Sequence, residues 1–279
     1  MNNIFDNDVK LKISIITIVY NNCIFIEDAI KSVVEQSYKN IEYIVIDGGS
    51  TDGTVDIIKA YETYITEWIS EEDNGIAEAF NKGLSLATGD YILFLNSDDM
   101  LVDYSVIQTM IHEISRNNYP CFVYGDFNII DRDSGNRLYR GVVKFSPKGM
   151  IKKGEMLPHP CLFTNREYFK HYGLFDTRYK IAMDYEIFLR GIFAEKVVHV
   201  PVVTTKIRSG GISTKNRSLV VDEIIAALEK NGFLRSKLAV TGRRLYFVLR
   251  YTARKILEYV YLYKIFSYAR NVLNRSSVT

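Results

Sequence analysis

Short apolar runs alternate with helical patterns along the first hundred residues. The apolar runs are 12–19 (KISIITIV), 41–46 (IEYIVI) and 91–95 (YILFL). Runs so rich in β-branched and aromatic residues are typical of strands buried on both faces of a mainly parallel sheet. Between them, apolar residues recur at helical spacing over 25–36, 55–64 and 76–86. This alternation predicts βαβ units, an α/β fold class and a doubly wound, nucleotide-binding half over residues 1–100.

The pattern changes after a predicted helix at 105–116. Residues 121–130 and 137–143 flank the polar turn 131–136 (DRDSGN), which indicates a hairpin. A short strand is expected at 161–164, and helices at 167–172 and 184–193. We therefore predict a second half of α+β character over 101–232. The helical period returns at 219–230 and 243–272, so residues 233–279 are predicted to form a helical tail.

Composition narrows the class of protein. With 47% hydrophobic and 24% charged residues, the chain is neither disordered, collagenous nor a disulfide scaffold. The 35 Lys and Arg against 33 Asp and Glu give a net charge of +2, which argues against a nucleic-acid binder. Residues 234–279 carry ten Lys or Arg and a single acid, Glu258, a net of +9, so the first 233 residues carry 2 − 9 = −7. An acidic body is thus joined to a basic tail.

The cysteine spacing and the polar start of the sequence predict the cellular compartment of the protein. Cys23, Cys121 and Cys161 have no CxxC spacing, which suits a reducing compartment. The polar start MNNIFDNDVKLK has no signal-peptide core, and no apolar run approaches the ~20 residues of a transmembrane helix. We therefore expect a cytoplasmic location.

The first candidate for chemistry is the loop 47–54 (DGGSTDGT). It follows a buried strand and precedes a helix, at the strand end where open α/β sheets bind ligands. Asp47 could accept hydrogen bonds from a nucleobase or a ribose. The alternative is a tight turn with a helix N-cap at Ser50, Asp52 or Thr54. The loop is neither GxGxxG nor a Walker loop, which argues against hydride transfer and P-loop chemistry.

The second candidate is Asn96-Ser97-Asp98-Asp99, which also follows a buried strand. Its carboxylates are expected at the same edge of the sheet as Asp47. Clustered carboxylates suit a divalent cation, Mg²⁺ or Mn²⁺, held together with the oxygens of a diphosphate. The alternative is that they only cap the helix that follows.

The motifs together resemble the family 2 glycosyltransferases of GT-A fold, similar to bacterial enzymes of exopolysaccharide and O-antigen synthesis. The resemblance rests on ISIITIVYNN from residue 13, IDGGSTDGT from 46 and SEEDNGIAEAFNKGLSLATGDYILFLNSDD from 70. It extends through PHP at 158–160, GLFD at 173–176, AMDYE at 182–186 and GGIS at 210–213. The resemblance implies a GT-A catalytic domain over 1–232, with an acceptor-binding half at 101–232 and a C-terminal helical extension.

The resemblance also implies roles on the donor side. Thr17 and Tyr20 match positions that line the nucleobase, and Asp47 matches the acid that contacts base or ribose. Lys82 lies where the family places a residue near the sugar nucleotide, although a solvated helix lysine is the alternative. Asn96-Ser97-Asp98 aligns with the metal-binding DxD motif, with Asp98 as the metal ligand. Asn96 departs from the usual Asp, so one formal charge is missing near the metal.

On the acceptor side, Asp184 matches the general base of the family's Glu-Asp motif, with Met183 in place of the Glu. An N-cap role for Asp184 is compatible with that function. His159 lies near the acceptor in the family, and a structural imidazole is the alternative. Arg208 could reach phosphate oxygens from a loop that orders over the donor as a lid; an ordinary mobile loop is the alternative.

The tail interleaves aromatic rings with basic residues, as in 246–251 (YFVLRY). Such an amphipathic segment can bind anionic headgroups, so we expect a peripheral location on the inner face of the membrane. The alternatives are helices that pack on the catalytic body or form a homo-oligomer contact. Nucleic-acid binding by the tail is the least favoured.

The predicted function is an inverting, metal-dependent transfer of a sugar from a nucleoside-diphosphate sugar to a carbohydrate, lipid-linked acceptor in surface polysaccharide synthesis. Because Asn96 and Met183 depart from the family pattern, the alternative is a catalytically weak nucleotide-sugar-binding or scaffold protein of the same fold. A nucleotidyltransferase is a third hypothesis, but its Gly-rich, basic start is missing near residue 20.

Overall fold

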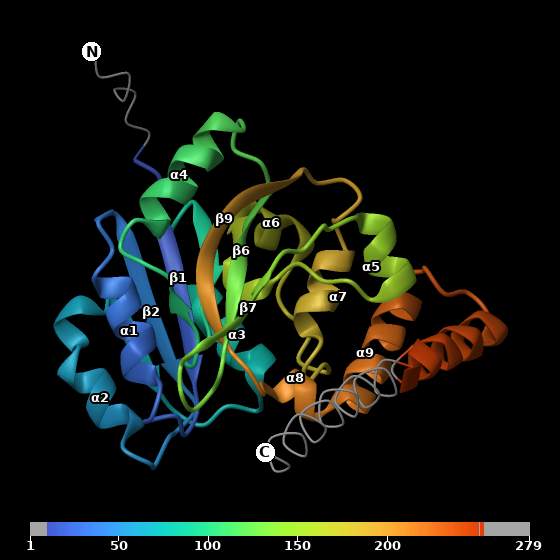
Figure 1. The fold of residues 1–279 in the computed structure, drawn as a ribbon, viewed down its shortest axis with the longest axis horizontal. Coiled ribbons are helices and arrows are strands. Elements are labelled where there is room, and N and C mark those ends of the chain that lie inside the picture. The colour runs from blue at the N-terminus through green and yellow to red at the C-terminus, as the bar shows by residue number, and fades with distance from the viewer. Residues whose placement is uncertain (1–9, 251, 254–279) are drawn as a thin grey trace, which may run out of the picture.

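The computed structural model describes residues 10–250, 252 and 253, and within them one mixed sheet forms the centre of the molecule (Figure 1). Its strand order is β3-β2-β1-β4-β8-β6-β9-β5, with β7 paired to β6. Strands β1 to β4 are parallel, whereas β8 runs antiparallel to both β4 and β6. The strands are β1 Ile13–Val19, β2 Ile41–Asp47, β3 Glu67–Ser70, β4 Tyr91–Phe94, β5 Met100–Leu101, β6 Phe122–Ile130, β7 Arg137–Gly141, β8 Leu162–Asn165 and β9 Val197–Arg208.

Helices cover both faces of the sheet. Alternate residues of β1 face opposite sides, so Ile15 joins one apolar core and Ile16 the other. The core of Ile15 includes residues of α1 Ile26–Val34, α2 Thr54–Ala60 and α4 Val106–Arg116. The core of Ile16 includes residues of α3 Ile76–Leu86, α5 Pro147–Lys153, α6 Arg166–Tyr172, α7 Met183–Leu189 and α9 Arg217–Lys230. The short elements are η1 Glu62–Tyr64, η2 His159–Cys161 and α8 Ile212–Lys215.

The apolar pattern located most of these elements. The α/β class is confirmed, the predicted hairpin is the β6–β7 pair, and the helix expected at 76–86 is α3. Several elements were not predicted, among them β3, α5 and the strand β9. Five of the first seven residues of β9 are Val, but the strand has mixed burial and no clean alternation.

The C-terminal extension is partly packed on the body. Residues 237–250 are helical, and Phe247 and Leu234 belong to the same apolar core as Ile16 (Figure 1). Arg243 donates to the carbonyl oxygens of Ile151 and Lys152 in α5. The rest of the tail, including most of the helix expected at 243–272, lies outside the described residues. Within residues 10–250, none of the helices is long and apolar enough to cross a membrane.

A buried carboxylate joins the strands at the edge opposite their carboxyl ends. Glu42 accepts from Lys12 Nζ at 2.6 Å and from the Ser14 hydroxyl at 2.5 Å. It also accepts from both the N–H and the hydroxyl of Thr88, at 2.7 and 2.6 Å. Burial alone would raise the pKa of Glu42, but these donors together lower it to about 2.

Glu42→Gln is expected to lower the free energy of unfolding at pH 7 by about 1–3 kcal/mol, because Lys12 loses its counter-charge and one acceptor becomes a donor. Since the folded pKa lies below the unfolded value of about 4.3, the ionised Glu42 stabilises the protein above that pH. This contribution is lost as the pH falls toward 2, so the variant should also show a weaker decline in stability over that window.

Chemical denaturation at several pH values measures both effects. Glu67→Gln, on the exposed face of β3, is the matched control and should behave as the unmodified protein. Equal stability of the two variants would contradict the role of Glu42.

Candidate active site

Two consecutive asparagines join the carboxyl ends of β1, β2 and β4. The Asn21 N–H donates to the Ser50 hydroxyl at 2.7 Å, and its side-chain oxygen accepts from the Thr51 N–H at 2.9 Å. Asn22 donates from its side chain to the Ser97 hydroxyl at 2.8 Å. The two predicted acidic loops therefore lie at one edge of the sheet, as the strand order requires.

Asp47 is fully buried and shapes the loop that follows β2. Its carboxylate accepts from the N–H groups of Gly49 and Ser50, at 3.1 and 2.9 Å, and from the Ser70 hydroxyl at 2.7 Å. It also accepts from the Ser50 hydroxyl. These hydrogen bonds match the tight turn considered for the loop 47–54. The contact of Asp47 with a sugar nucleotide stays a prediction.

Tyr20 and Lys82 border the same loop. Tyr20 is 66% exposed, so its ring is accessible at the end of β1. A Cβ on Gly48 would lie 2.6 Å from a carboxylate oxygen of Asp73, so a larger residue there would displace the Asp73 side chain. Lys82 contacts Glu71 at 2.8 Å and donates to the Glu72 carbonyl oxygen at 3.1 Å, which holds the second loop in place.

Thr17 does not reach the surface. Its side chain is fully buried, and its hydroxyl accepts from the Tyr43 hydroxyl at 3.2 Å. The expectation that Thr17 lines the nucleobase is therefore not met by this arrangement, because the side chain points into the core of α1, α2 and α4 beside Tyr43.

The loop after β4 divides its polar groups between two roles. Asn96 donates to a carboxylate oxygen of Asp99 at 2.8 Å, and Asp99 also accepts from the Arg208 N–H at 3.2 Å. Burial and the neighbouring Asp98 raise the pKa of Asp99. Asp98 instead stays partly exposed, and one of its oxygens accepts from Arg132 at 2.8 Å. Asp98 is thus the accessible carboxylate of this motif.

Arg208 is the last residue of β9 and is not on a loop, which corrects the expectation from sequence. Its buried guanidinium pairs with Asp28 of α1 at 2.5 Å and lies 4.3 Å from the centre of the Phe25 ring. Arg132, from the turn between β6 and β7, lies 4.8 Å from the same ring. Two guanidinium groups therefore lie against the Phe25 ring, and that of Arg132 also pairs with Asp98.

Asp184, at the start of α7, has a carboxyl group with an unusual environment. Its side chain is 20% exposed, and Oδ1 accepts from the Tyr185 N–H at 2.7 Å. Burial raises the pKa of Asp184 to about 7, although the Tyr185 N–H acts in the opposite direction. A carboxyl group with such a pKa can exchange a proton near neutral pH.

His159 lies beside Asp184 but does not form an ion pair with it. Its Nδ1 is 3.9 Å from Asp184 Oδ2. Burial lowers the pKa of His159 to about 3, so the ring is neutral at pH 7. Four phenylalanine rings surround it with centroid distances of 4.7 to 6.1 Å: Phe80, Phe94, Phe175 and Phe188. Because Phe94 belongs to β4, His159 links Asp184 to the strand that precedes Asp98.

A residue that the sequence did not reveal anchors Asp184. Glu223 of α9 is buried and accepts from the N–H groups of Lys180, Ile181 and Ala182 at 2.7, 2.9 and 2.7 Å. These are the last N–H groups before α7, so Glu223 fixes the start of the helix that carries Asp184. Glu223 lies 39 residues after Asp184, and the apolar period of α9 gave no signal for this role.

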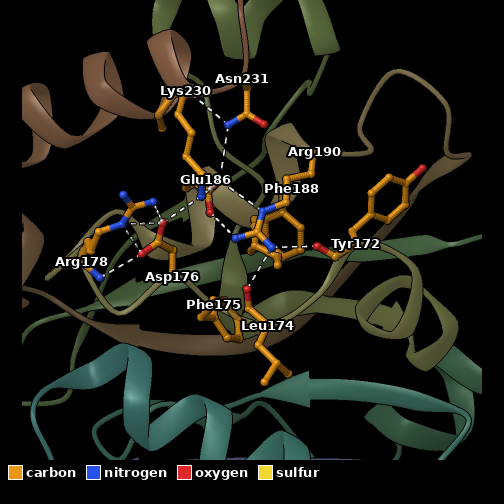
Figure 2. Close-up of polar contacts among 12 residues, drawn as sticks. Tyr172, Leu174, Phe175, Asp176, Arg178, Glu186, Phe188, Arg190, Lys230 and Asn231 are labelled. Atoms are coloured by element: carbon orange, nitrogen blue, oxygen red, sulfur yellow. Dashed lines mark hydrogen bonds and ion pairs between the residues drawn. The ribbon is translucent and has the colours of Figure 1, made fainter.

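A second buried carboxylate holds the other side of α7. Figure 2 shows Glu186, Arg190 and Lys230 pointing toward one another; Glu186 contacts Arg190 at 2.5 Å and Lys230 at 2.8 Å. Lys230 also contacts Asp176 at 2.8 Å. Burial would raise the pKa of Glu186, but these cations hold it below its ordinary value. Two acids thus fasten α7 to α9, one at Glu223 and one at Glu186.

The comparisons with known proteins agree with this geometry. The model of glycosyl transferase family 2 matches residues 14–173. An uncharacterised glycosyltransferase of Mycobacterium tuberculosis H37Rv is 30% identical over 234 residues, which cover 84% of this chain and 87% of that protein. The chain belongs to glycosyl transferase family 2. A PGL/p-HBAD biosynthesis glycosyltransferase of Mycobacterium bovis BCG is 28% identical over 207 residues, with 72% of this chain and 78% of that protein covered.

Solved structures confirm the GT-A fold. Staphylococcus aureus TarS 1-349 in complex with UDP-GlcNAc superposes with a TM-score of 0.62 at 16% identity, covering 87% of this family 2 chain and 73% of that chain. The mannosyltransferase PcManGT of Pyrobaculum calidifontis, in complex with GDP-Man and Mn²⁺, gives 0.60 at 18% identity, with 79% and 64% covered. The enzyme is therefore a glycosyltransferase of GT-A fold with a helical C-terminal region.

Glu223→Gln is expected to lower the free energy of unfolding by about 1–3 kcal/mol, because an amide has one oxygen for three N–H donors and turns an N–H₂ group toward them. Chemical denaturation monitored by circular dichroism measures the change. Glu229→Gln, exposed on the same helix, is the matched control and should stay within about 0.5 kcal/mol of the unmodified enzyme. A Glu223 variant as stable as this control would refute the anchoring role.

Proposed function

We propose that this glycosyltransferase moves one sugar, with inversion, from a nucleoside-diphosphate sugar to a hydroxyl group of a carbohydrate, lipid-linked acceptor, with Asp184 as the general base. The observation that carries the proposal is the half-buried carboxyl of Asp184, whose pKa is raised to about 7 at the start of an anchored helix. In a nucleotide-sugar transferase, a group with these properties is suited to take a proton from an attacking alcohol.

In the proposed step, the ionised Asp184 takes the proton of the acceptor hydroxyl. The hydroxyl oxygen forms a bond to the anomeric carbon while the bond from that carbon to the diphosphate oxygen breaks. The configuration at the anomeric carbon is thereby inverted, and a nucleoside diphosphate leaves. Asp184 ends protonated and returns its proton to solvent, to which a fifth of its side chain is open.

Neutral His159 keeps Asp184 basic. A protonated imidazole at 3.9 Å would stabilise the carboxylate and lower its pKa, which would weaken the base. The surrounding Phe rings prevent this protonation, because a buried charge there would have no hydration. Within the described residues, the Nε2 atom of His159 is buried and has no hydrogen-bond partner, as expected for a neutral ring enclosed by phenylalanines.

The side chains at this edge fit a divalent cation only together with the phosphate oxygens of the nucleotide sugar. Within residues 10–250, no group of three or more His, Cys, Asp or Glu side chains is arranged to hold a metal ion. Mg²⁺ and Mn²⁺ are commonly held by one or two carboxylates together with phosphate oxygens and water, and Asp98 is the accessible carboxylate here. A bound cation would neutralise charge on the leaving diphosphate.

The donor class is supported by the neighbours that carry UDP-GlcNAc and GDP-Man in their structures. The lipid-linked acceptor and a peripheral location on the inner membrane face are supported by the C-terminal helix. Residues 237–250 expose Leu245, Val248 and Leu249 on the side opposite the buried Phe247. Residues 251–279, of which the structure describes only 252 and 253, carry five Lys or Arg and one Glu. Each basic residue near an anionic surface contributes about 1 kcal/mol.

The transfer rate is expected to fall tenfold for each pH unit below about 7, because Asp184 must be ionised to act as a base. Asp184→Asn should lower the rate by about 10²- to 10⁴-fold at every pH while nucleotide binding is kept. Nucleotide sugars are first screened by thermal shift with Mn²⁺, and product formation is then followed for the stabilising donor.

Asp133→Asn, an exposed acid in the turn before β7, is the control for the pH profile. Tight donor binding with no transfer or donor hydrolysis by the unmodified enzyme would favour the scaffold hypothesis. An Asp184→Asn enzyme with the unmodified rate would exclude Asp184 as the base.

Removal of residues 251–279 is expected to weaken binding to vesicles of phosphatidylglycerol and phosphatidylcholine while donor binding is unchanged, because the packed helix with Phe247 is kept. Leu245→Glu combined with Leu249→Glu should weaken binding further. Leu138→Glu, an exposed residue of β7, is the control. Vesicle sedimentation measures the difference, and equal sedimentation of all variants would contradict membrane attachment.

A further inference from the structure

The turn between β6 and β7 places the guanidinium of Arg132 against the proposed metal ligand, Asp98. Arg132 donates to Asp98 Oδ2 at 2.8 Å and lies over the Phe25 ring at 4.8 Å. Its side chain is 35% exposed, so one side of the guanidinium faces solvent. Within the described residues, its guanidinium hydrogen-bonds only to Asp98, although it has five N–H donors. Arg132 therefore has unused donors beside the site of the diphosphate.

Arg132 neutralises the Asp98 carboxylate in the free enzyme. Asp28 pairs with Arg208 and Asp98 pairs with Arg132, while Asp99 is buried and accepts from the Asn96 side chain. Asn96 contributes no charge. A divalent cation that approaches Asp98 therefore meets a carboxylate already occupied by a guanidinium, and the two positive groups compete for it.

Resting on the proposed function, we propose that Arg132 is a diphosphate-binding residue: it pairs with Asp98 in the free enzyme and turns to the phosphate oxygens of the donor when a divalent cation takes Asp98. A planar guanidinium suits this exchange, because it binds carboxylate and phosphate oxygens with the same fork of N–H groups. The Phe25 ring supports it in both positions.

The exchange also favours the leaving group. When the sugar–oxygen bond breaks, the diphosphate gains negative charge, so its attraction to Arg132 increases as the reaction proceeds. In this proposal Arg132 supplies positive charge to the diphosphate. The motif that holds the cation has one carboxylate fewer, because Asn96 takes the place of an Asp.

The test measures binding and does not require an acceptor. The probes are Mn²⁺ alone and either UDP or GDP, whichever stabilises the enzyme more in a thermal shift, with the matching nucleoside as a comparison. With saturating Mn²⁺, Arg132→Ala should weaken binding of the nucleoside diphosphate about tenfold or more and leave nucleoside binding unchanged. Binding of Mn²⁺ alone, followed by electron paramagnetic resonance, should become tighter, because a competitor is removed.

Arg137→Ala, an exposed residue of the same hairpin, is the matched control, and Arg132→Lys should recover part of the lost affinity. Unchanged nucleoside-diphosphate affinity in Arg132→Ala would overturn the proposal, and unchanged Mn²⁺ affinity would overturn the exchange at Asp98. Asp98→Ala separates this from the proposed function. If Asp98→Ala changes neither Mn²⁺ nor nucleotide binding, the cation assignment fails, while the effect of Arg132→Ala on nucleoside-diphosphate binding still decides whether Arg132 contacts the diphosphate.

Discussion

The hydrogen bonds of Asn21 and Asn22 hold together the edge of the sheet on which the whole site depends. Parallel strands bring their carboxyl ends to one edge, but they do not fix the loops that follow. Here the end of β1 binds the loop after β2 through Ser50 and Thr51, and the loop after β4 through Ser97. Asp47 is fully engaged in shaping one of these loops, whereas Asp98 keeps a partly exposed carboxylate at this edge.

The carboxyl groups near this edge have three different electrostatic environments. Asp98 is exposed enough to bind a cation and is balanced by Arg132. Glu223 is surrounded by N–H donors and serves as an anchor. Asp184 is half-buried with one N–H donor and a neutral histidine as neighbour, so its pKa rises to about 7. Burial and partners alone thus distinguish the proposed ligand, the anchor and the proposed base among residues of one chemical type.

The sequence predicted the parts of this arrangement that depend on local patterns. Dense apolar runs located β1, β2 and β4, and the helical period located α3 and α4, so the edge that carries Asp47 and Asp98 followed from the fold class. The sequence did not reveal that the Thr17 side chain is enclosed beside Tyr43, and it placed Arg208 on a loop where the structure has the end of β9, because both depend on which neighbours enclose the side chain. Glu223 and Arg132 reach the site from distant elements, and no local pattern marks such contacts.

The attachment of α7 explains why the second half of the domain tolerates Met183 where the family has an acid. Met183 is buried in the apolar core of Ile16, so it contributes packing and no charge. The acids that position α7 are Glu223, which comes from α9 and meets its start, and Glu186, which α9 meets through Lys230. Residues of α9 pack in the same apolar core as Phe247 of the helix 237–250. This C-terminal helix therefore packs against the elements that position Asp184. The helix α9, which positions the proposed base, therefore shares its core with the helix 237–250, whose exposed apolar side chains are proposed to meet the acceptor's membrane.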